Sequence, residues 1–281
     1  MSTPILEFTG ERFTPECVRE IWYEHMHRYA LAAELAKGRR VLDAACGEGY
    51  GSALLAREAN SVLGLDVSAQ AIEHARQRYR DLESLSFELA DVTRLDALEK
   101  GQFDLICSFE TLEHVEAQEA MLDGFARLLA PGGLLLVSTP DKRTYSDLTG
   151  FRNEFHVREL YREEFEGMLR QRFPAVRLLG QKLLFQSVLW EADVDGRWSA
   201  CTVDDARRSP GLNHPPLYWI AACAVREADL AALPSLHLFG DAAESVYAHY
   251  YHEIRQNMRA GARIQELERE VEALRAQLAH R

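Results

Sequence analysis

The 281-residue chain is poor in cysteine, lacks a long apolar run and has no excess of positive charge. Its five cysteines show no paired spacing, which indicates reduced thiols rather than a disulfide framework. No run of about 20 apolar residues is present, and residues 1–12 have neither a basic start nor an apolar core. These absences argue against a transmembrane segment and a secretory signal, and they predict a cytoplasmic protein.

Acidic residues outnumber basic ones, 44 against 32, so the formal net charge is −12. Nucleic-acid binding depends on clustered Lys and Arg, and we therefore expect no nucleic-acid partner. The pairs Arg39–Arg40 and Arg207–Arg208 are the candidates for a local basic patch, but solvated loop charges explain them more simply. The hydrophobic fraction of 47% is enough for a sizeable core.

The most informative segment is VLDAACGEGYG, residues 41–51. An apolar strand runs there into a turn of small residues and then into a predicted helix. Gly47, Gly49 and Gly51 lack a Cβ, so the chain can adopt positive φ and let a bulky ligand lie against its backbone. Asp43, at the end of the strand, is placed to point into the crevice. Such a turn is typical of nucleotide-binding sites.

Two further acids follow two further predicted strands. Asp66 ends the short run VLGLD, about one helix and one strand after Gly47, where an acid can hold both hydroxyls of a ribose. Asp91 follows the apolar run 85–90 in the same way. The first turn has no Lys, so the three acids fit a positively charged, phosphate-free nucleoside better than ATP or NAD.

These residues resemble the class I S-adenosylmethionine (SAM) dependent methyltransferases over the stretch from Arg40 to Val137. VLDAACGEGYG is similar to their first motif, GLDVS to the ribose-binding segment, LADV to the adenine-contacting segment and LLAPGGLLLVSTP to their fifth strand. The alternative is a Rossmann-like domain of degenerate function. The resemblance implies SAM as the cofactor, held by Asp43, Ala45, Gly47, Gly49, Asp66, Val67, Asp91 and Val92.

By this resemblance, Asp43 and Gly47 flank the methionine part of SAM, Asp66 the ribose and Asp91 the adenine amino group. Ala45 stands where the family usually has the first glycine of its run. Because alanine is small, we expect only slightly tighter packing there.

Strand and helix patterns alternate from about residue 40 to 140, which predicts a parallel, doubly wound sheet. The resemblance implies a Rossmann-like α/β fold with a seven-stranded sheet, an antiparallel last strand and a methyltransferase domain over 39–235. The predicted helices cover 49–58, 68–81 and 117–130, the second one opening at Ser68 as its N-cap. The predicted strands cover 40–45, 61–66, 85–90, 103–108, 133–139, 176–186 and 217–225.

Residues 1–38 are predicted to form an N-terminal helical cap, because apolar and aromatic positions recur at helical spacing over 15–36. Arg12, Tyr23, His27 and Arg28 are candidates to contact the methionine carboxylate or the acceptor. Arg28 is the preferred candidate, since an arginine binds a carboxylate by charge-assisted hydrogen bonds. A helix that merely packs on the sheet is an equal alternative.

The chemistry is expected after the fourth and fifth strands, where the sequence reads CSFETLEHV, residues 107–115. Glu110, Glu113 and His114 stand at i, i+3 and i+4, so they share one face in a helical turn. His156 lies in the loop after the fifth strand and is expected to complete the group from across the cleft. We interpret His114 and His156 as the catalytic candidates near the acceptor.

The pattern Glu-x-x-Glu-His resembles both ubiquinone-type O-methyltransferases and small-RNA 2′-O-methyltransferases, some of which hold magnesium with it. A metal bound by Glu110, Glu113 and His114 is therefore an alternative to base catalysis, and a purely structural role is a third. A hydroxyl acceptor must lose its proton, and neutral histidine accepts protons near pH 7. The imidazole therefore favours O-methylation.

The C-terminal segment 241–281 carries an apolar heptad pattern flanked by charged residues, which predicts a coiled coil. Ala260 and Asn257 extend the seam backwards as weaker positions that set the register. The alternatives are a short oligomerisation helix, part of a longer coiled coil, or a helix that packs on its own domain. The seam consists of Ile264, Leu267, Val271, Leu274 and Leu278.

The segments FTGERF, residues 8–13, and YEHMHRY, residues 23–29, together with the coiled coil, resemble bacterial methyltransferases of surface-polysaccharide (O-antigen, lipopolysaccharide) assembly. This resemblance implies a glycan hydroxyl or sugar phosphate as acceptor, and a partner such as a glycosyltransferase at the inner face of the membrane. A quinone or aromatic natural product is the alternative acceptor. A coiled-coil scaffold with a SAM-like domain is the alternative without enzymatic activity.

Overall fold

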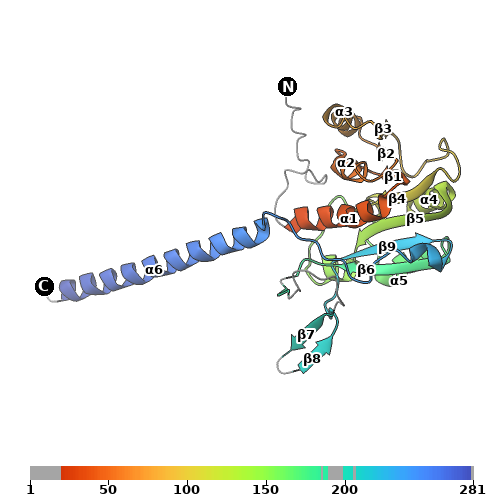
Figure 1. Ribbon diagram of the computed structural model, residues 1–281. Coiled ribbons are helices and arrows are strands. Elements are labelled where there is room, and N and C mark those ends of the chain that lie inside the picture. The colour runs from red at the N-terminus through yellow and green to blue at the C-terminus, as the bar shows by residue number, and fades with distance from the viewer. Residues whose placement is uncertain (1–19, 185, 189–198, 205–206, 280–281) are drawn as a thin grey trace, which may run out of the picture.

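A computed structural model describes residues 20–184, 186–188, 199–204 and 207–279. Figure 1 shows a twisted sheet with helices on both faces and one long helix projecting from it. None of the helices in these ranges combines the length and apolarity that a membrane crossing needs. The sheet strands are β1 (Arg40–Ala44), β2 (Ser61–Asp66), β3 (Leu85–Leu89), β4 (Phe103–Ser108), β5 (Leu129–Pro140), β6 (Ala175–Gln181) and β9 (Tyr218–Ala224).

The seven strands lie in the order β3-β2-β1-β4-β5-β9-β6. The first five are parallel, and β9 runs antiparallel to both of its neighbours, β5 and β6. This confirms the Rossmann-like α/β fold with an antiparallel last strand. The observed β5 begins earlier than predicted, and β6 ends earlier. A two-stranded hairpin of β7 (Cys201–Asp204) and β8 (Arg207–Pro210) lies in a segment where we predicted no strand.

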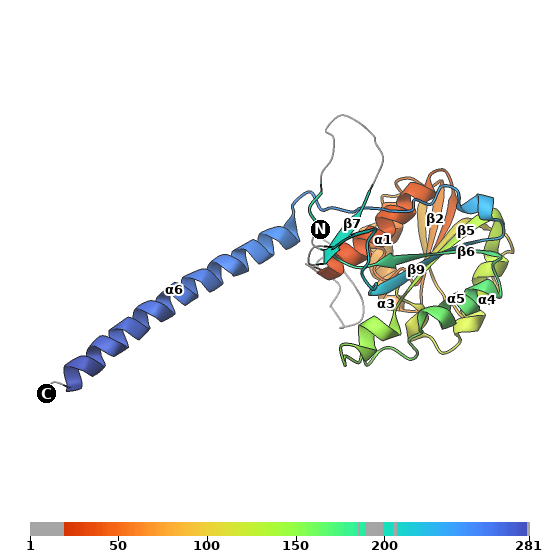
Figure 2. The same cartoon turned by 90° about the horizontal axis from the view of Figure 1, so that it is seen from below.

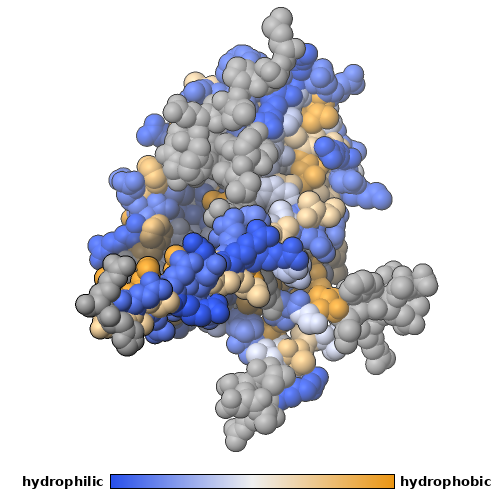
Figure 3. Space-filling model, turned by 90° about the vertical axis from the view of Figure 1, so that its left-hand side faces the viewer, coloured by the Kyte–Doolittle hydropathy of each residue, from blue (hydrophilic) through white to orange (hydrophobic). Residues whose placement is uncertain are grey.

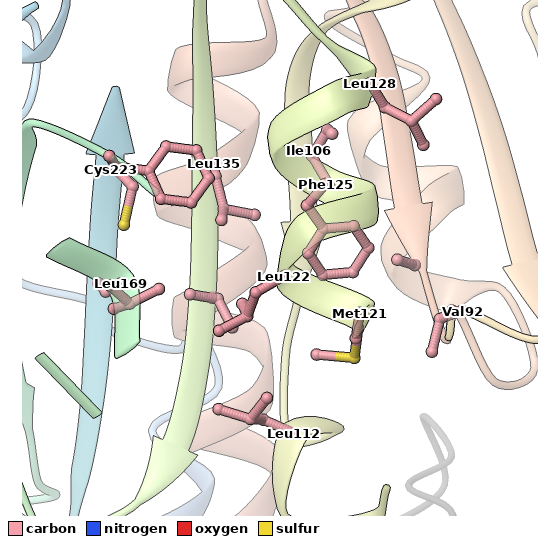
Figure 4. Packing of buried hydrophobic residues seen from close by; sticks show 14 of the residues in the cluster. Val92, Ile106, Leu112, Met121, Leu122, Phe125, Leu128, Leu135, Leu169 and Cys223 are labelled. Carbon is pink, nitrogen blue, oxygen red and sulfur yellow. The ribbon is translucent and has the colours of Figure 1, made fainter. Parts of the chain in front are cut away.

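Helices cover both faces of the sheet because each presents an apolar stripe to it. On one face, α4 packs Met121, Leu122 and Phe125 against β4 and β5, as Figure 4 shows. The opposite face is covered by α1 and α2, with the short helix η3. The elements are α1 (Glu20–Ala36), α2 (Tyr50–Leu55), α3 (Ala69–Arg78), α4 (Gln118–Leu128), α5 (Arg162–Arg170), the short helices η1 (Leu112–His114), η2 (Arg143–Asp147) and η3 (Glu227–Leu230), and α6 (Ser245–Ala279).

The helix predictions hold with shorter bounds. Ser68 is the N-cap of α3, because its side chain accepts a hydrogen bond from the Ala71 amide at 3.3 Å. The first predicted helix ends at Leu55 instead of 58. α1 begins at Glu20, the first described residue, so the start of the cap and the segment FTGERF lie outside the described residues. The three-part domain division stays a prediction.

α6 is one helix of 35 residues that leaves the globular part of the molecule. Figures 1 and 2 show it pointing away from the sheet in two perpendicular views. Val246 at its base is its only buried residue among those described. The helix therefore does not pack its apolar seam on its own domain, which was one of the alternatives.

Candidate functional site

The candidate site lies where the strand order reverses. β1 pairs in parallel with β2 on one side and with β4 on the other. The chain therefore crosses to opposite sides of β1, and a crevice opens between the loops at the carboxyl ends of these strands. We call the ends of β1, β2 and β3 the donor half of the site. The acceptor half comprises the ends of β4 and β5 and the following segment 141–161.

The turn after β1 is built from left-handed backbone. Gly47 has φ of 57° and Gly49 has φ of 90°, values that glycine adopts without strain. At Gly49 a Cβ would lie 2.6 Å from the ring of Phe87, so a side chain is also excluded sterically. Ala45 has φ of 63° as well. Our expectation of slightly tighter packing at Ala45 missed the real consequence, which is backbone strain of about 1–2 kcal/mol for a residue with a Cβ.

Asp43 is held inside the protein. It is fully buried, and its two carboxylate oxygens accept hydrogen bonds from the hydroxyls of Tyr29 at 2.9 Å and Ser52 at 2.6 Å. Burial raises its pKa to about 6, although both hydroxyls act in the opposite direction. The expected orientation into the crevice is not what the structure shows, and contact with the methionine part of SAM stays a prediction.

Asp66 joins the first turn to the end of β2. Its carboxylate accepts the amide of Gly47 at 2.9 Å and the amide of Ser68 at 2.8 Å. The side chain is mostly buried, with the residue 8% exposed. These two amides fix the carboxylate beside the left-handed turn, which is where a ribose-binding acid is expected.

The end of β3 carries an exposed acid and the end of β2 an exposed apolar side chain. Asp91 accepts hydrogen bonds from the hydroxyl and the amide of Thr93, which lower its pKa and keep it charged. Val67 is 75% exposed, so it offers an apolar surface for a flat ring. Val92 instead packs in the core with Leu95, because its side chain points into the sheet–helix interface.

Arg28 projects from α1 as a buried cation. Its Nε donates to Gln181 at 2.8 Å, its guanidinium lies 4.5 Å from the centre of the Tyr218 ring, and Nη2 is 3.5 Å from a Glu110 oxygen. Burial is the largest single influence and disfavours the charge, but Glu110, Tyr218 and Glu24 together outweigh it, so the pKa of Arg28 is raised. Nη1 and Nη2 are buried and make no hydrogen bond to any described residue. These nitrogens suit a carboxylate ligand.

The other cap candidates lie elsewhere. His27 is 3.0 Å from His237, and its ring stacks on Phe239, while burial lowers its pKa to about 4. Tyr23 donates a hydrogen bond to Asp241 at 3.4 Å. Both side chains therefore tie α1 to the segment before α6. Arg12 lies outside the described residues.

Glu110 does not share a face with Glu113 and His114. Its backbone is left-handed, with φ of 51°, so the helical turn η1 begins only at Leu112. The Glu110 carboxylate accepts the hydroxyl of Ser138 at 2.7 Å and faces Arg28. The expectation of one helical face was wrong, because the chain turns sharply between the two acids.

Glu113, His114 and His156 converge in the acceptor half. One ligand atom from each lies within 4.8 Å of the other two, and the two imidazole rings meet edge to face with centres 5.0 Å apart. Glu113 is fully buried; Thr139 donates to its Oε2 at 3.2 Å, and Oε1 makes no hydrogen bond to a described residue. Burial and the nearby Glu110 raise the pKa of Glu113 well above its usual range.

The two histidines are oriented by different partners. The Nε2 of His156 faces the amide of Asn153 at 3.0 Å and its Nδ1 faces Glu159 at 2.6 Å, so the proton sits on Nδ1 and points at the carboxylate. His114 Nδ1 lies 3.0 Å from the carbonyl of Phe155, which places a proton on that nitrogen. Nε2 of neutral His114 is then the basic atom.

A cavity of about 380 Å³ adjoins His156. Basic, acidic and neutral polar side chains line it, with the basic ones more numerous than the acidic ones. Tyr145 stacks on the His156 ring with centres 5.4 Å apart. A polar acceptor is therefore accommodated beside the histidine pair. The lining residues are Lys142, Ser146, Asp147, Arg152, Asn153, His156, Val157, Arg158 and Glu159.

Residues 35–184 match the model of a family described as a methyltransferase domain. The chain belongs to this methyltransferase family. It is 33% identical over 242 residues to a "Probable S-adenosylmethionine-dependent methyltransferase" of Mycobacterium tuberculosis, covering 84% of this chain and 85% of the relative. Together these matches make the protein a SAM-dependent methyltransferase.

Further relatives agree with the family and the fold. A ubiquinone biosynthesis O-methyltransferase of Psychrobacter arcticus is 36% identical over 115 residues, or 40% of this chain and 44% of the relative. The crystal structure of a SAM-dependent methyltransferase from Thermotoga maritima superimposes with a TM-score of 0.52 at 18% identity, covering 73% of this chain and 90% of the other. The latter likeness supports the fold alone.

Several residues that support the methyltransferase site carry no local sequence signal. Gln181 and Tyr218 position Arg28 from β6 and β9, more than 150 residues away in the chain. Glu159 orients His156 from three positions further on. The hydrogen bond from the Tyr29 hydroxyl to Asp43 was not predicted.

Proposed function

We propose that this methyltransferase transfers the methyl group of SAM to a hydroxyl, or a phosphate, of a glycan or sugar intermediate in surface-polysaccharide biosynthesis. The observation that carries the proposal is the convergence of Glu113, His114 and His156 beside a polar cavity. A hydroxyl acceptor must lose a proton during transfer, and Nε2 of His114 accepts it. Glu113, 3.9 Å from that nitrogen, then faces the imidazolium that forms.

The donor half fits SAM on three observations. Gly47 and Gly49 give the turn after β1 a left-handed backbone, the Arg28 guanidinium has two buried nitrogens that make no hydrogen bond to a described residue, and Val67 is exposed. We assign Arg28 to the methionine carboxylate, Asp66 to the ribose hydroxyls and Asp91 to the adenine amino group. The sulfonium of bound SAM makes its methyl group electrophilic, so the protein mainly has to align the acceptor and exclude water.

The cavity supports a sugar or sugar phosphate as the acceptor. Lys142, Arg152 and Arg158 offer positive charge for a phosphate, and Ser146 and Asn153 offer hydrogen bonds for hydroxyls. Tyr145 supplies a ring on which a sugar face can lie. A glycosyltransferase partner that holds the enzyme at the inner face of the membrane belongs to the same proposal.

A quinone or aromatic natural product is the second candidate acceptor. The ubiquinone biosynthesis O-methyltransferase relatives favour it, although they match less than half of this chain. Phe151 and Phe155 are exposed near the cavity and provide apolar surface for an aromatic ring. A scaffold without enzymatic activity is disfavoured by membership in the methyltransferase family.

A divalent cation is an alternative occupant of the acceptor half. Glu113, His114 and His156 offer one oxygen and two nitrogens at ligand spacing, and Glu113 Oε1 makes no hydrogen bond to a described residue. Glu110 lies outside this group. Competition with a fluorescent chelator measures Mn²⁺ binding directly, and loss of binding in His156→Ala would support a metal-assisted transfer over simple base catalysis.

The acceptor is tested by incubating the protein with isotopically labelled SAM and a panel of glycans, sugar phosphates and phenols, followed by mass spectrometry. A labelled methyl group on a sugar oxygen or phosphate supports the first proposal. A label only on phenolic oxygens replaces it by the second. Isothermal titration with SAM and with S-adenosylhomocysteine separately tests the donor half, because it needs no acceptor.

A further inference from the structure

We propose that the distal half of α6 pairs with the same segment of a second copy, as a parallel, in-register two-stranded coiled coil. This interface is independent of the methyl-transfer chemistry. It follows from three features of α6: an exposed apolar seam, the kinds of apolar residue in that seam, and the charges that flank it.

The seam is exposed along its whole length. Its five residues follow one another at alternating steps of three and four, and their exposed fractions run from 42% to 69%. Figure 3 looks at the molecule from the side on which α6 projects and shows apolar side chains among charged ones on this helix. A seam of this kind is not stable in water without a partner face. The seam residues are Ile264, Leu267, Val271, Leu274 and Leu278.

The residue types select two strands. In the heptad frame, Ile264, Val271 and Leu278 occupy a positions, two of them β-branched, and Leu267 and Leu274 occupy d positions. β-branched residues at a combined with leucine at d favour parallel dimers over trimers and tetramers. Asn257, two heptads before Val271, is also an a position, and a single polar residue there fixes register.

The flanking charges select the orientation. In a parallel pair, each g residue faces the e residue of the next heptad on the other helix, so Arg263 faces Glu268 and Glu270 faces Arg275, with opposite charges both times. In an antiparallel pair that buries the same apolar residues, Glu268 of one helix faces Glu268 of the other, and Glu270 faces Glu270. Like charges then meet at both places. Charge complementarity therefore supports the parallel arrangement. In the single chain Arg263 contacts Glu266 of its own helix. When two helices pair, Arg263 instead faces Glu268 of the other helix.

The base of α6 is attached to the globular part. Asp241 accepts the amide of Ser245 at 2.9 Å and caps the helix, and Tyr250 donates to Glu20 of α1 at 2.5 Å. A parallel pair therefore places both methyltransferase domains at the same end of the assembly.

Sedimentation velocity of the full chain tests the interface, over concentrations from about 1 to about 100 μM, because dimerisation depends on concentration. We expect a dimer for the natural sequence and a monomer for Leu267→Asp/Leu274→Asp. The matched control, Gln265→Asp/Ala276→Asp, adds the same charge on the outer face and stays dimeric. If the natural chain remains monomeric, as when another protein fills the seam, the proposal is overturned. A trimer of the natural chain, or a dimer of the Leu267→Asp/Leu274→Asp variant, also overturns it.

The orientation has its own test. Glu270→Arg puts like charges opposite Arg275 and is expected to weaken the dimer about tenfold. Adding Arg275→Glu restores attraction and returns the dissociation constant to near its original value. A double variant no tighter than Glu270→Arg alone overturns the parallel register. SAM binding by isothermal titration stays unchanged in every variant, which excludes misfolding as the cause.

Discussion

The donor half and the acceptor half of the site hold their functional groups in different ways. In the donor half, Asp66 is fixed by amides of the adjoining turns and Asp91 by its near neighbour Thr93. In the acceptor half, His114 is held by Phe155, which is 41 positions away, and Glu113 by Thr139, which is 26 positions away. The donor acids are therefore held by groups 2 to 19 positions away, and the acceptor groups by groups 26 to 41 positions away.

The strongest test of this difference is His114→Ala. If its Nε2 is the base, turnover with saturating acceptor falls about 100-fold, whereas the dissociation constant of SAM does not change because the residue lies in the acceptor half. Single-turnover kinetics with labelled SAM measures the chemical step. His249→Ala on α6 is the control and keeps full activity. Near-full turnover of His114→Ala would refute base catalysis by this residue.

Asp66→Ala addresses the donor half. Loss of charged hydrogen bonds to the ribose is expected to weaken SAM binding about 30-fold, measured by isothermal titration. Asp96→Ala removes an exposed acid elsewhere on the surface and serves as the control. Because Asp66 also holds two backbone amides, the melting temperature of the variant shows whether the fold is retained. SAM binding of normal strength in a folded variant would remove Asp66 from the cofactor site.

Arg28 contacts Glu110 of the acceptor half but is assigned to the methionine carboxylate of SAM, so its replacement sharpens the comparison. Arg28→Met removes the proposed carboxylate partner and is expected to weaken SAM binding about tenfold. Arg28→Lys keeps the charge but loses the planar fork, so its affinity falls between those of the other two proteins. Equal affinities of all three for SAM would show that Arg28 acts on structure or acceptor instead.

Asp43 predicts a pH dependence of stability. Its pKa rises on folding from 3.8 to about 6, so the protonated form is favoured in the native state. The stabilisation that this pKa difference provides is fully present below pH 3.8 and is lost as the pH rises through about 6. Asp43→Asn cannot titrate, so its free energy of unfolding varies less over this range than that of the natural protein. Urea unfolding at several pH values measures both slopes, and identical slopes would contradict the shifted pKa.

The smallest effect is expected at Ala45. Its left-handed backbone costs about 1–2 kcal/mol for alanine, and glycine removes this strain but adds conformational entropy to the unfolded chain. Ala45→Gly should therefore stabilise the protein by about 0.5 kcal/mol, measured by urea unfolding. Gly38→Ala makes the opposite change at a left-handed position with free space around it, and it should destabilise.

The same division explains what the sequence revealed. The strands and the acids after β2 and β3 follow from local patterns, because each is encoded within a few residues. The prediction that Glu110 shares a helical face with Glu113 and His114 was wrong, because the left-handed φ of Glu110 interrupts the helical turn that this spacing requires. The orientation of Asp43 also differed from the predicted one, because the hydroxyls of Tyr29 on α1 and Ser52 on α2 bind its carboxylate oxygens. The β7–β8 hairpin gave no alternating pattern that would have predicted it.

The length of α6 before the seam sets the distance between each methyltransferase domain and the coiled coil that would join two copies. The stretch from Ser245 to Asn257, the first a position, rises about 1.5 Å per residue and so spans about 18 Å. If the seam pairs as proposed, this unpaired stretch of helix separates the coiled coil from both methyltransferase domains.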